Sequence, residues 1–196
     1  MFIKEEIKET AKHIFRNHKA SVVVKTEDMM VIDWKQPESS EYCVQYILDS
    51  KNGTLHISGD MGYCISCWHS RLEFSKMVEV IQTPDYWIGK FKASSDRYTY
   101  NDKDIKEDLC DIRDLYVKVL GDKEYIRTDF DEMYRICLDN AVRGENSYTR
   151  ELIALIEKYD DEWYDDDKWT TLGKRLSPRI SLWALGLKMA WEQIKE

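Results

Sequence analysis

Hydrophobic residues at the start of the chain recur at steps of three and four. In FIKEEIKETAKHIF, residues 2–15, the apolar positions are Ile3, Ile7, Ala11 and Ile14 or Phe15. This spacing places them on one face of a helix and leaves the intervening Lys and Glu residues toward water. The pattern predicts an amphipathic helix over residues 2–18.

The following segment changes to short apolar runs rich in β-branched residues. SVVVKTEDMMVIDW breaks at Thr26-Glu27-Asp28, which indicates two strands around a tight turn. YCVQYILD and TLHISGD flank Ser50-Lys51-Asn52-Gly53, and Asn-Gly favours a hairpin because both residues tolerate positive φ. We therefore expect an antiparallel sheet of at least four strands, or five if YCISCW is included.

Helical periodicity returns from Ser70. Ser70 and Glu73 have the spacing of a capping box, and Thr83-Pro84 is typical of a second, short helix. KFKASSDRYTY fits either an edge strand or an extended link. Further helices are predicted over residues 102–120, with Asn101 as the cap, over 129–142, from Ser147, and from Ser177-Pro178 to the C-terminus.

The apolar stripe of the 102–120 helix is the most regular in the chain, and its members follow steps of 4, 3, 4 and 3: Ile105, Leu109, Ile112, Tyr116 and Val119. The order of helix, sheet and then helices predicts the α+β class. We expect an α+β sheet domain over residues 1–100 and a helical region packed on it over residues 101–196, with one continuous domain as the alternative.

Composition supports a folded chain without a membrane segment. Of the 196 residues, 43% are hydrophobic, and there are eight Gly and three Pro, too few for a long flexible linker. The N-terminus mixes Lys and Glu where a signal peptide needs an apolar core. We expect a cytoplasmic protein with no membrane contact and with its five cysteines reduced.

The net charge of −8 is unevenly distributed. Residues 102–167 contain 21 Asp and Glu against 10 Lys and Arg, a balance of −11, whereas residues 1–101 have −1 and residues 168–196 have +4. An acidic middle argues against direct nucleic-acid binding, which needs a concentrated basic surface. It suits a partner with a basic surface instead.

Cys64, Cys67 and His69 form the first candidate site. A Cys-x-x-Cys pair can bind zinc or carry out redox chemistry, and a zinc site would take further ligands from His69, His56 or Cys43. On a strand, however, residues i and i+3 point to opposite faces. We expect buried structural thiols, and keep metal binding and redox chemistry as alternatives.

Residues 159–169, YDDEWYDDDKW, form the second candidate. Trp and Tyr side chains can anchor a partner while carboxylates attract its basic surface. The alternatives are a divalent cation site and a solvated loop whose Trp residues pack onto the core. The candidate binding residues are Asp161, Glu162, Trp163, Asp165, Asp166, Asp167 and Trp169.

The third candidate is the polar face of the 102–120 helix. Asp104, Asp108 and Asp111 stand at helical spacing, with Glu107 and Asp114 beside them. A row of carboxylates can imitate nucleic-acid phosphates for a basic groove, although an ordinary solvated helix has the same pattern. Spacing indicates no nucleophile with a base, and no phosphate-binding Gly-rich loop is present, so we expect no cofactor and no enzymatic activity.

Three segments resemble a family of uncharacterised proteins found in phages and mobile elements of Gram-positive bacteria. They are MVIDWKQPESSEYCVQYILD, LHISGDMGYCISCW and SSDRYTYND, and they cover about residues 29–110. The shared pattern is I-D-W-x-x-P-x-S-S-x-Y, then S-G-D-x-G, then S-S-D-x-Y-x-Y. The resemblance implies a protein that blocks host defence, in the manner of anti-CRISPR proteins.

Together these features predict a non-enzymatic phage or mobile-element protein. It would inhibit a host nucleic-acid-targeting defence complex, a protein or ribonucleoprotein with a basic surface, from the host cytoplasm. One alternative is a metal- or thiol-dependent enzyme centred on Cys64, Cys67 and His69. The other is a phage regulatory or scaffold protein, and the many Trp and Tyr residues leave room for a homodimer face.

Overall fold

The chain forms two compact units. The computed structural model describes residues 3–142, 149–160, 162 and 166–195. One unit comprises Met1–Arg97 with Ser177–Glu196, and the other comprises Tyr98–Leu176. The first junction lies close to the division expected at residue 100. Residues 177–196, however, group with the first unit, because their helix packs on that unit's sheet.

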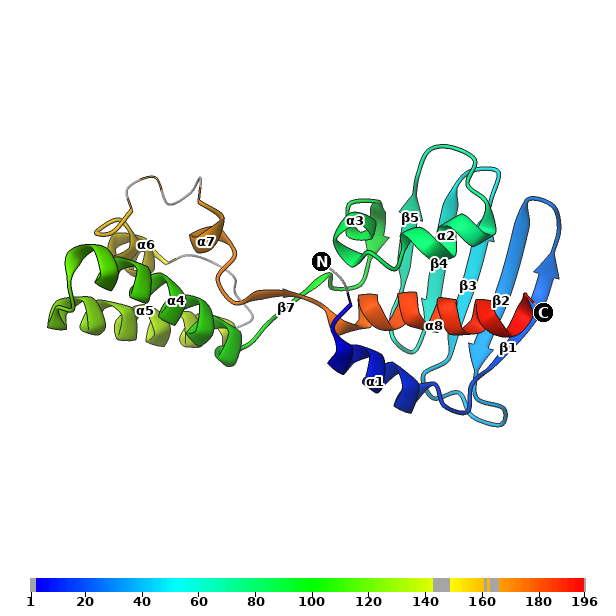
Figure 1. Cartoon of the computed structure of the whole chain (residues 1–196), viewed down its shortest axis with the longest axis horizontal. Helices are drawn as coiled ribbons and strands as arrows, with labels where there is room; N and C mark the ends of the chain where they lie inside the picture. The colour runs from blue at the N-terminus through cyan, green and yellow to red at the C-terminus, as the bar shows by residue number, and fades with distance from the viewer. Residues whose placement is uncertain (1–2, 143–148, 161, 163–165, 196) are drawn as a thin grey trace. The chain divides into compact units, whose positions relative to one another are not determined.

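The first unit contains an antiparallel sheet with one helical layer (Figure 1). Six strands are hydrogen-bonded in the order β1-β2-β3-β4-β5-β6, so each strand pairs with its neighbours in the sequence. The elements are α1 (Glu5–Ile14), β1 (Lys19–Lys25), β2 (Met29–Lys35), β3 (Val44–Asp49), β4 (Thr54–Gly59), β5 (Cys64–Cys67), α2 (Phe74–Val80), α3 (Pro84–Ile88), β6 (Phe91–Ser94) and α8 (Pro178–Ile194).

The predicted class is confirmed: an N-terminal helix, an antiparallel sheet and then a largely helical C-terminal half. The sheet has six strands, one more than the upper expectation, because Phe91–Ser94 pairs with β5. The turn at Asn52-Gly53 joins β3 to β4, and Gly53 has φ 59°. Positive φ is the property for which Gly is favoured there.

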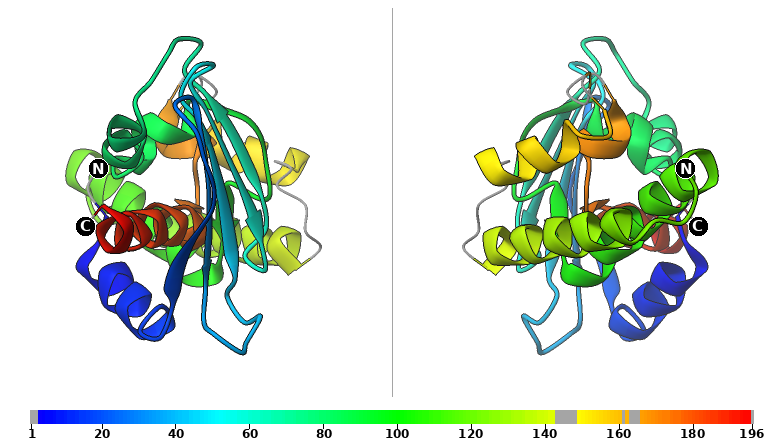
Figure 2. Two further views of the ribbon diagram at one scale, coloured as in Figure 1. Left: turned by 90° about the vertical axis from the view of Figure 1, so that its right-hand side faces the viewer. Right: turned by 90° about the vertical axis from the view of Figure 1, so that its left-hand side faces the viewer.

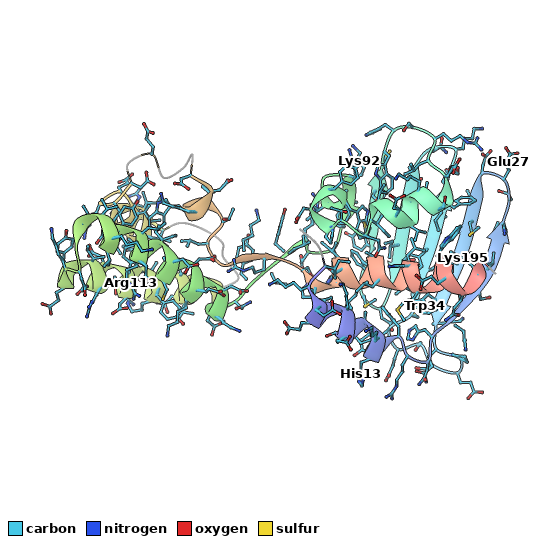
Figure 3. The ribbon with its side chains drawn as sticks, viewed as in Figure 1. His13, Glu27, Trp34, Lys92, Arg113 and Lys195 are labelled. Carbon is cyan, nitrogen blue, oxygen red and sulfur yellow. The ribbon has the colours of Figure 1, made fainter. Side chains whose placement is uncertain are left out.

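Alternating side chains of the sheet build the core of the first unit. Met30, Ile32 and Trp34 on β2 are buried while their neighbours are less so, the period expected of a strand covered on one face. Helix α8 packs across β1, β2 and β3, and the edge-on view shows the helices of the first unit, α1, α2, α3 and α8, on one side of the sheet (Figure 2). Trp34 lies in this interface (Figure 3).

A hydrogen bond ties α8 to the centre of the sheet. The Tyr46 hydroxyl donates to the Trp183 carbonyl oxygen at 3.0 Å, and both residues are fully buried. Gly186 lies beside it, and a Cβ there would come within 2.5 Å of the Tyr46 hydroxyl. The close approach of the helix to Tyr46 therefore requires glycine at this position.

The second unit is mainly helical. Its elements are β7 (Tyr98–Tyr100), α4 (Asp102–Leu120), α5 (Glu124–Val142), α6 (Arg150–Ile156), α7 (Asp167–Thr170) and β8 (Lys174–Leu176). Strands β7 and β8 pair antiparallel, so the two ends of the unit lie side by side. Its core combines residues from α4, α5, α6 and α7, including Ile105, Leu109, Phe130, Ile156 and Trp169.

Several helix ends differ from the expectation. Helix α2 begins at Phe74 with Glu73 at the N-cap, and no side chain caps it, so the predicted box at Ser70 is wrong. The Asn101 cap is confirmed, because its side chain accepts a hydrogen bond from the Asp104 backbone N–H. Ser147 lies outside the described residues, and Thr149 caps α6 in the same manner as Asn101 caps α4.

Candidate functional site

Two of the expected binding carboxylates on α4 are held by Arg175 of β8. Its guanidinium donates to both Asp108 oxygens, from Nη2 to Oδ1 at 2.7 Å and from Nη1 to Oδ2 at 3.0 Å. Asp108 Oδ2 also accepts the Gly173 backbone N–H at 2.7 Å, and Arg175 Nε lies 3.4 Å from Asp104 Oδ1. Asp104 and Asp108 therefore join β8 to α4 within the unit, and Arg175 already offsets part of their charge, while their contact with a partner stays a prediction.

Lys168 holds two acids of the 159–169 stretch in a similar way. Its Nζ donates to Asp160 Oδ2 at 2.8 Å and to Asp166 Oδ2 at 2.5 Å. These bonds lower the pKa of both carboxyl groups. Burial alone would lower the pKa of Lys168, but the two carboxylates raise it overall. Asp166 also accepts the Lys168 backbone N–H and thus caps α7, so its role is structural.

Trp169 belongs to the core and not to the surface. It is fully buried, stacks near Phe130 and Tyr116, and its indole N–H donates to Asp160 Oδ2 at 3.1 Å. A side chain with no exposed area cannot reach a partner while the unit stays folded. The burial of Trp169 favours the alternative of a Trp packed onto the core, and its part in binding a partner stays a prediction.

Of the remaining residues in this stretch, Glu162 and Asp167 are exposed. Asp161, Trp163 and Asp165 lie outside the described residues. The Asp167 backbone carbonyl accepts a hydrogen bond from the Thr171 hydroxyl at 2.6 Å, and Asp167 lies in the first turn of α7. Two exposed carboxylates thus remain from this candidate among the described residues.

Three of the α4 acids stay on the surface. Glu107, Asp111 and Asp114 are exposed, and Asp114 accepts a hydrogen bond from Arg113 Nη2 at 3.0 Å. Among residues 3–142, 149–160, 162 and 166–195, no ion pair involves Glu107 or Asp111. Asp111 lines a shallow depression of about 240 Å³ together with Leu115, Thr171 and Arg175.

The whole net charge of the chain resides in the second unit. Residues 98–176 contain 21 Asp and Glu against 13 Lys and Arg, a balance of −8. The first unit contains 16 of each, and its balance is zero. The two units therefore differ in the long-range field that they present to a charged partner.

The sequence also misassigned Val119, which it placed in the apolar stripe of α4. Its side chain is 80% exposed, and Leu115 beside it is more than half exposed. The buried members of the stripe are Ile105, Leu109 and Ile112. The periodicity continues to the end of α4, but the elements packed against the stripe do not cover the last turn.

Cys64 and Cys67 lie on opposite faces of β5, as strand alternation predicts. Cys64 is fully buried, and burial raises the pKa of its thiol to about 12. Cys67 is half-buried on the other face, with its Sγ 3.6 Å from His69 Nδ1. The two sulfurs cannot share a ligand. Within the described residues, no three His, Cys, Asp or Glu side chains are grouped so that they could hold a metal ion.

In comparisons with known proteins, no protein-family model, curated protein or solved structure matches the chain. In the described parts of the chain, no helix combines the length and the apolar character needed to cross a bilayer. The geometry and charge of the two units are therefore the basis for proposing a function.

Proposed function

We propose that the protein is a non-enzymatic interaction protein that binds a basic surface through the acidic unit of residues 98–176. The observation that carries the proposal is the segregation of charge, with −8 in this unit and zero in the other. A single-sign field raises the encounter rate with an oppositely charged partner. It also disfavours contact with a nucleic-acid backbone.

The binding residues are those acids that the unit does not use internally. Glu107, Asp111 and Asp114 are exposed along α4. Glu162 precedes α7, and Asp167 is its first residue. We do not include Asp104, Asp108 and Asp166 among the proposed binding residues. Arg175 forms ion pairs with Asp104 and Asp108, and Lys168 forms one with Asp166. The proposed surface is therefore smaller than the count of acids in the sequence suggests.

The chemistry of the partner follows from the same surface. Protein grooves that bind nucleic acid present Lys and Arg toward phosphates, and surface carboxylates can occupy the same positions. The resemblance of residues 29–110 to proteins of phages and mobile elements supports the proposal that the partner is a nucleic-acid-targeting defence complex of the host. In that setting, binding would inhibit the complex by excluding its nucleic acid.

A thiol- or metal-dependent enzyme has less support. Cys64 is buried with a raised pKa, and the thiolate is the reactive form of cysteine. Cys67 Sγ lies 3.6 Å from His69 Nδ1, and within the described residues no third side chain is hydrogen-bonded to this imidazole to orient it, as a nucleophilic site typically requires. The other alternative, a regulatory or scaffold protein of a phage or mobile element, would bind its partner through the same acidic surface.

Copurification with candidate nuclease complexes tests the proposal. The tagged full chain should retain one complex and reduce its cleavage of target nucleic acid. Glu107→Lys with Asp111→Lys should release the complex, since the change replaces two attractive charges by two repulsive ones. Glu6→Lys with Glu41→Lys, at exposed positions of the neutral unit, is the matched control and should bind as the wild type does. Equal loss in both variants would contradict the proposal.

A further inference from the structure

Four large apolar side chains are exposed around the junction of α4 and α5. Leu115 is 54% exposed, Val119 80%, Leu120 42% and Tyr125 51%. Single exposed apolar residues are common, but several such residues close together in the sequence, at the end of α4 and the start of α5, are typical of an interaction surface. These four residues are called the apolar tip below. The tip lies at the end of α4 away from β7 (Figure 1).

Leu115 and Val119 continue a ridge that begins with carboxylates. Residues four apart on a helix line up in a ridge, and Glu107, Asp111, Leu115 and Val119 follow this spacing along α4. All four are exposed. The ridge spans 12 residues, which is about 18 Å at 1.5 Å per residue. Its polarity changes halfway, from two carboxylates to two aliphatic side chains.

A depression of about 240 Å³ runs beside the middle of this ridge. Asp111 and Leu115, the two residues at the change in polarity, both line it, and Ile112 adds apolar surface. The other residues that line it are Asp108, Lys168, Thr171 and Arg175, of which the last three belong to α7 and the segment after it. A partner element that follows the ridge can therefore place side chains into a recess instead of resting on a flat surface.

From this geometry we infer that the ridge and the apolar tip bind an amphipathic basic helix of a protein partner. Ridges of one helix pack into the grooves of another, so a second helix is the element that fits an exposed ridge. Its apolar side chains would cover Leu115 and Val119, and its Lys or Arg residues would lie toward Glu107 and Asp111. The inference rests on the proposed binding function and adds the chemistry of the partner.

Charge decides between this partner and a second copy of the chain. A copy would bring its own acidic unit of net charge −8 against the ridge, and like charges at an interface oppose association. A basic helix meets the carboxylate half of the ridge with the opposite charge. Nucleic acid is disfavoured for the same reason as a second copy, and it offers no aliphatic surface for Val119.

Titration of the full-length protein with defined helical peptides tests the inference. The probe is LKKLLKLLKKLLKL, labelled for fluorescence anisotropy. Its comparison peptides replace every Leu by Ser or every Lys by Glu. The wild-type chain should bind the Leu/Lys peptide at least about tenfold more tightly than either comparison peptide, because hot-spot contacts need both a desolvated apolar anchor and complementary charge.

Leu115→Ser with Val119→Ser should weaken binding of the Leu/Lys peptide by about tenfold or more. Val23→Ser is the matched control, since Val23 is 56% exposed on β1 of the neutral unit, and it should bind as the wild type does. Circular dichroism melting verifies that each variant is folded. Exposed substitutions of this kind change stability little.

The outcomes separate the inference from the proposed function. One outcome is that the Lys/Ser peptide binds as tightly as the Leu/Lys peptide and that the serine variants keep the wild-type affinity. The inference that apolar residues of the ridge bind the partner is then overturned, while the proposed acidic binding surface is retained. If neither basic peptide binds and no nuclease complex copurifies, both the inference and the proposed function are contradicted. If the wild type is a dimer by sedimentation and the serine variants are monomers, a second copy covers the tip and the inference is overturned.

Discussion

Arg175 and Asp108 form a bidentate ion pair between β8 and α4, with donor–acceptor distances of 2.7 and 3.0 Å. The pair connects the two ends of the helical unit, because β8 is the last element of residues 98–176 and α4 is its first helix. A planar guanidinium matches a carboxylate in this geometry better than a Lys ammonium does. Two acids of the predicted binding face, Asp104 and Asp108, therefore form ion pairs within the unit.

Removing this pair should destabilise the helical unit. We expect Arg175→Ala to lower the free energy of unfolding by about 1–3 kcal/mol, since it leaves a half-buried Asp108 with fewer partners. Arg175→Lys should recover only part of the loss, because an ammonium cannot bond both oxygens in the same geometry. Urea denaturation followed by circular dichroism measures the change.

The ion pair of Arg113 and Asp114 on the surface of α4 provides a control for this prediction. Arg113 donates a hydrogen bond to the neighbouring Asp114, whose side chain is largely exposed. Exposed pairs contribute about 0–1 kcal/mol, so Arg113→Ala should change stability less than Arg175→Ala. Equal losses in the two variants would show that the Arg175 pair is no more than a surface contact.

Trp169 should behave as a core residue. We expect Trp169→Phe to reduce the stability of the unit by about 1–3 kcal/mol, because it removes buried ring atoms and the hydrogen bond to Asp160. Denaturation of the variant in urea measures the effect. A variant as stable as the wild type that nevertheless loses its partner would restore Trp169 as a surface anchor.

The two cysteines of β5 should differ in reactivity. With a pKa of about 12, Cys64 has a thiolate fraction of roughly 10⁻⁴ at pH 8, and it is also buried. Iodoacetamide at pH 8 should therefore alkylate the half-buried Cys67 well before Cys64, as measured by peptide mass spectrometry. In denaturant both should react alike. Rapid labelling of Cys64 in the folded protein would contradict its placement in the core.

His18 should make the first unit less stable in mild acid. Burial between Phe15 and Trp34 lowers the pKa of its imidazole, although the hydrogen bond to the Tyr42 carbonyl opposes this. The unfolded chain keeps the ordinary pKa near 6.5, so it binds more protons than the folded state below that pH. Stability should be full above pH 6.5 and fall as the pH decreases through it.

Urea midpoints at pH 7.5, 6.5 and 5.5 measure this dependence. His18→Gln should flatten the profile over this range, because glutamine does not titrate. His13→Gln, at an exposed position of α1, should keep the wild-type profile. If His18→Gln retains the full fall in stability between pH 7.5 and 5.5, another group is responsible.

Local patterns in the sequence predicted local structure well. The apolar runs in MMVIDW and YCVQYILD located β2 and β3, and Asn-Gly located the turn between β3 and β4. Asn101 caps α4 as its position indicates. The Ser70 box failed because Glu73 itself occupies the N-cap position, where its side chain cannot also serve as the third residue of the helix. Spacing alone does not determine which of two polar residues, Ser70 or Glu73, precedes the first turn of the helix.

The candidate site depended on pairs that local spacing cannot reveal. Asp108 and Arg175 are 67 residues apart, and Asp129 accepts bonds from Lys158 and Tyr159, about 30 residues away. Which acids are neutralised is therefore decided by tertiary packing. Val119 shows the same limit for apolar residues, because its stripe is regular but the core ends before it.

The most direct test of the acidic-surface proposal compares two sets of isosteric charge removals in one binding assay. One variant carries Glu107→Gln, Asp111→Asn and Asp167→Asn in the acidic unit, and the other carries Glu6→Gln, Glu41→Gln and Glu192→Gln at exposed positions of the neutral unit. Both lose three negative charges, so their net charges are equal. Affinity for the copurified nuclease complex is measured at low and moderate salt.

The proposal predicts that the first variant binds at least about tenfold more weakly than the wild type, with a smaller dependence on salt, and that the second binds as the wild type does. Equal affinities of the two variants for the complex would contradict it.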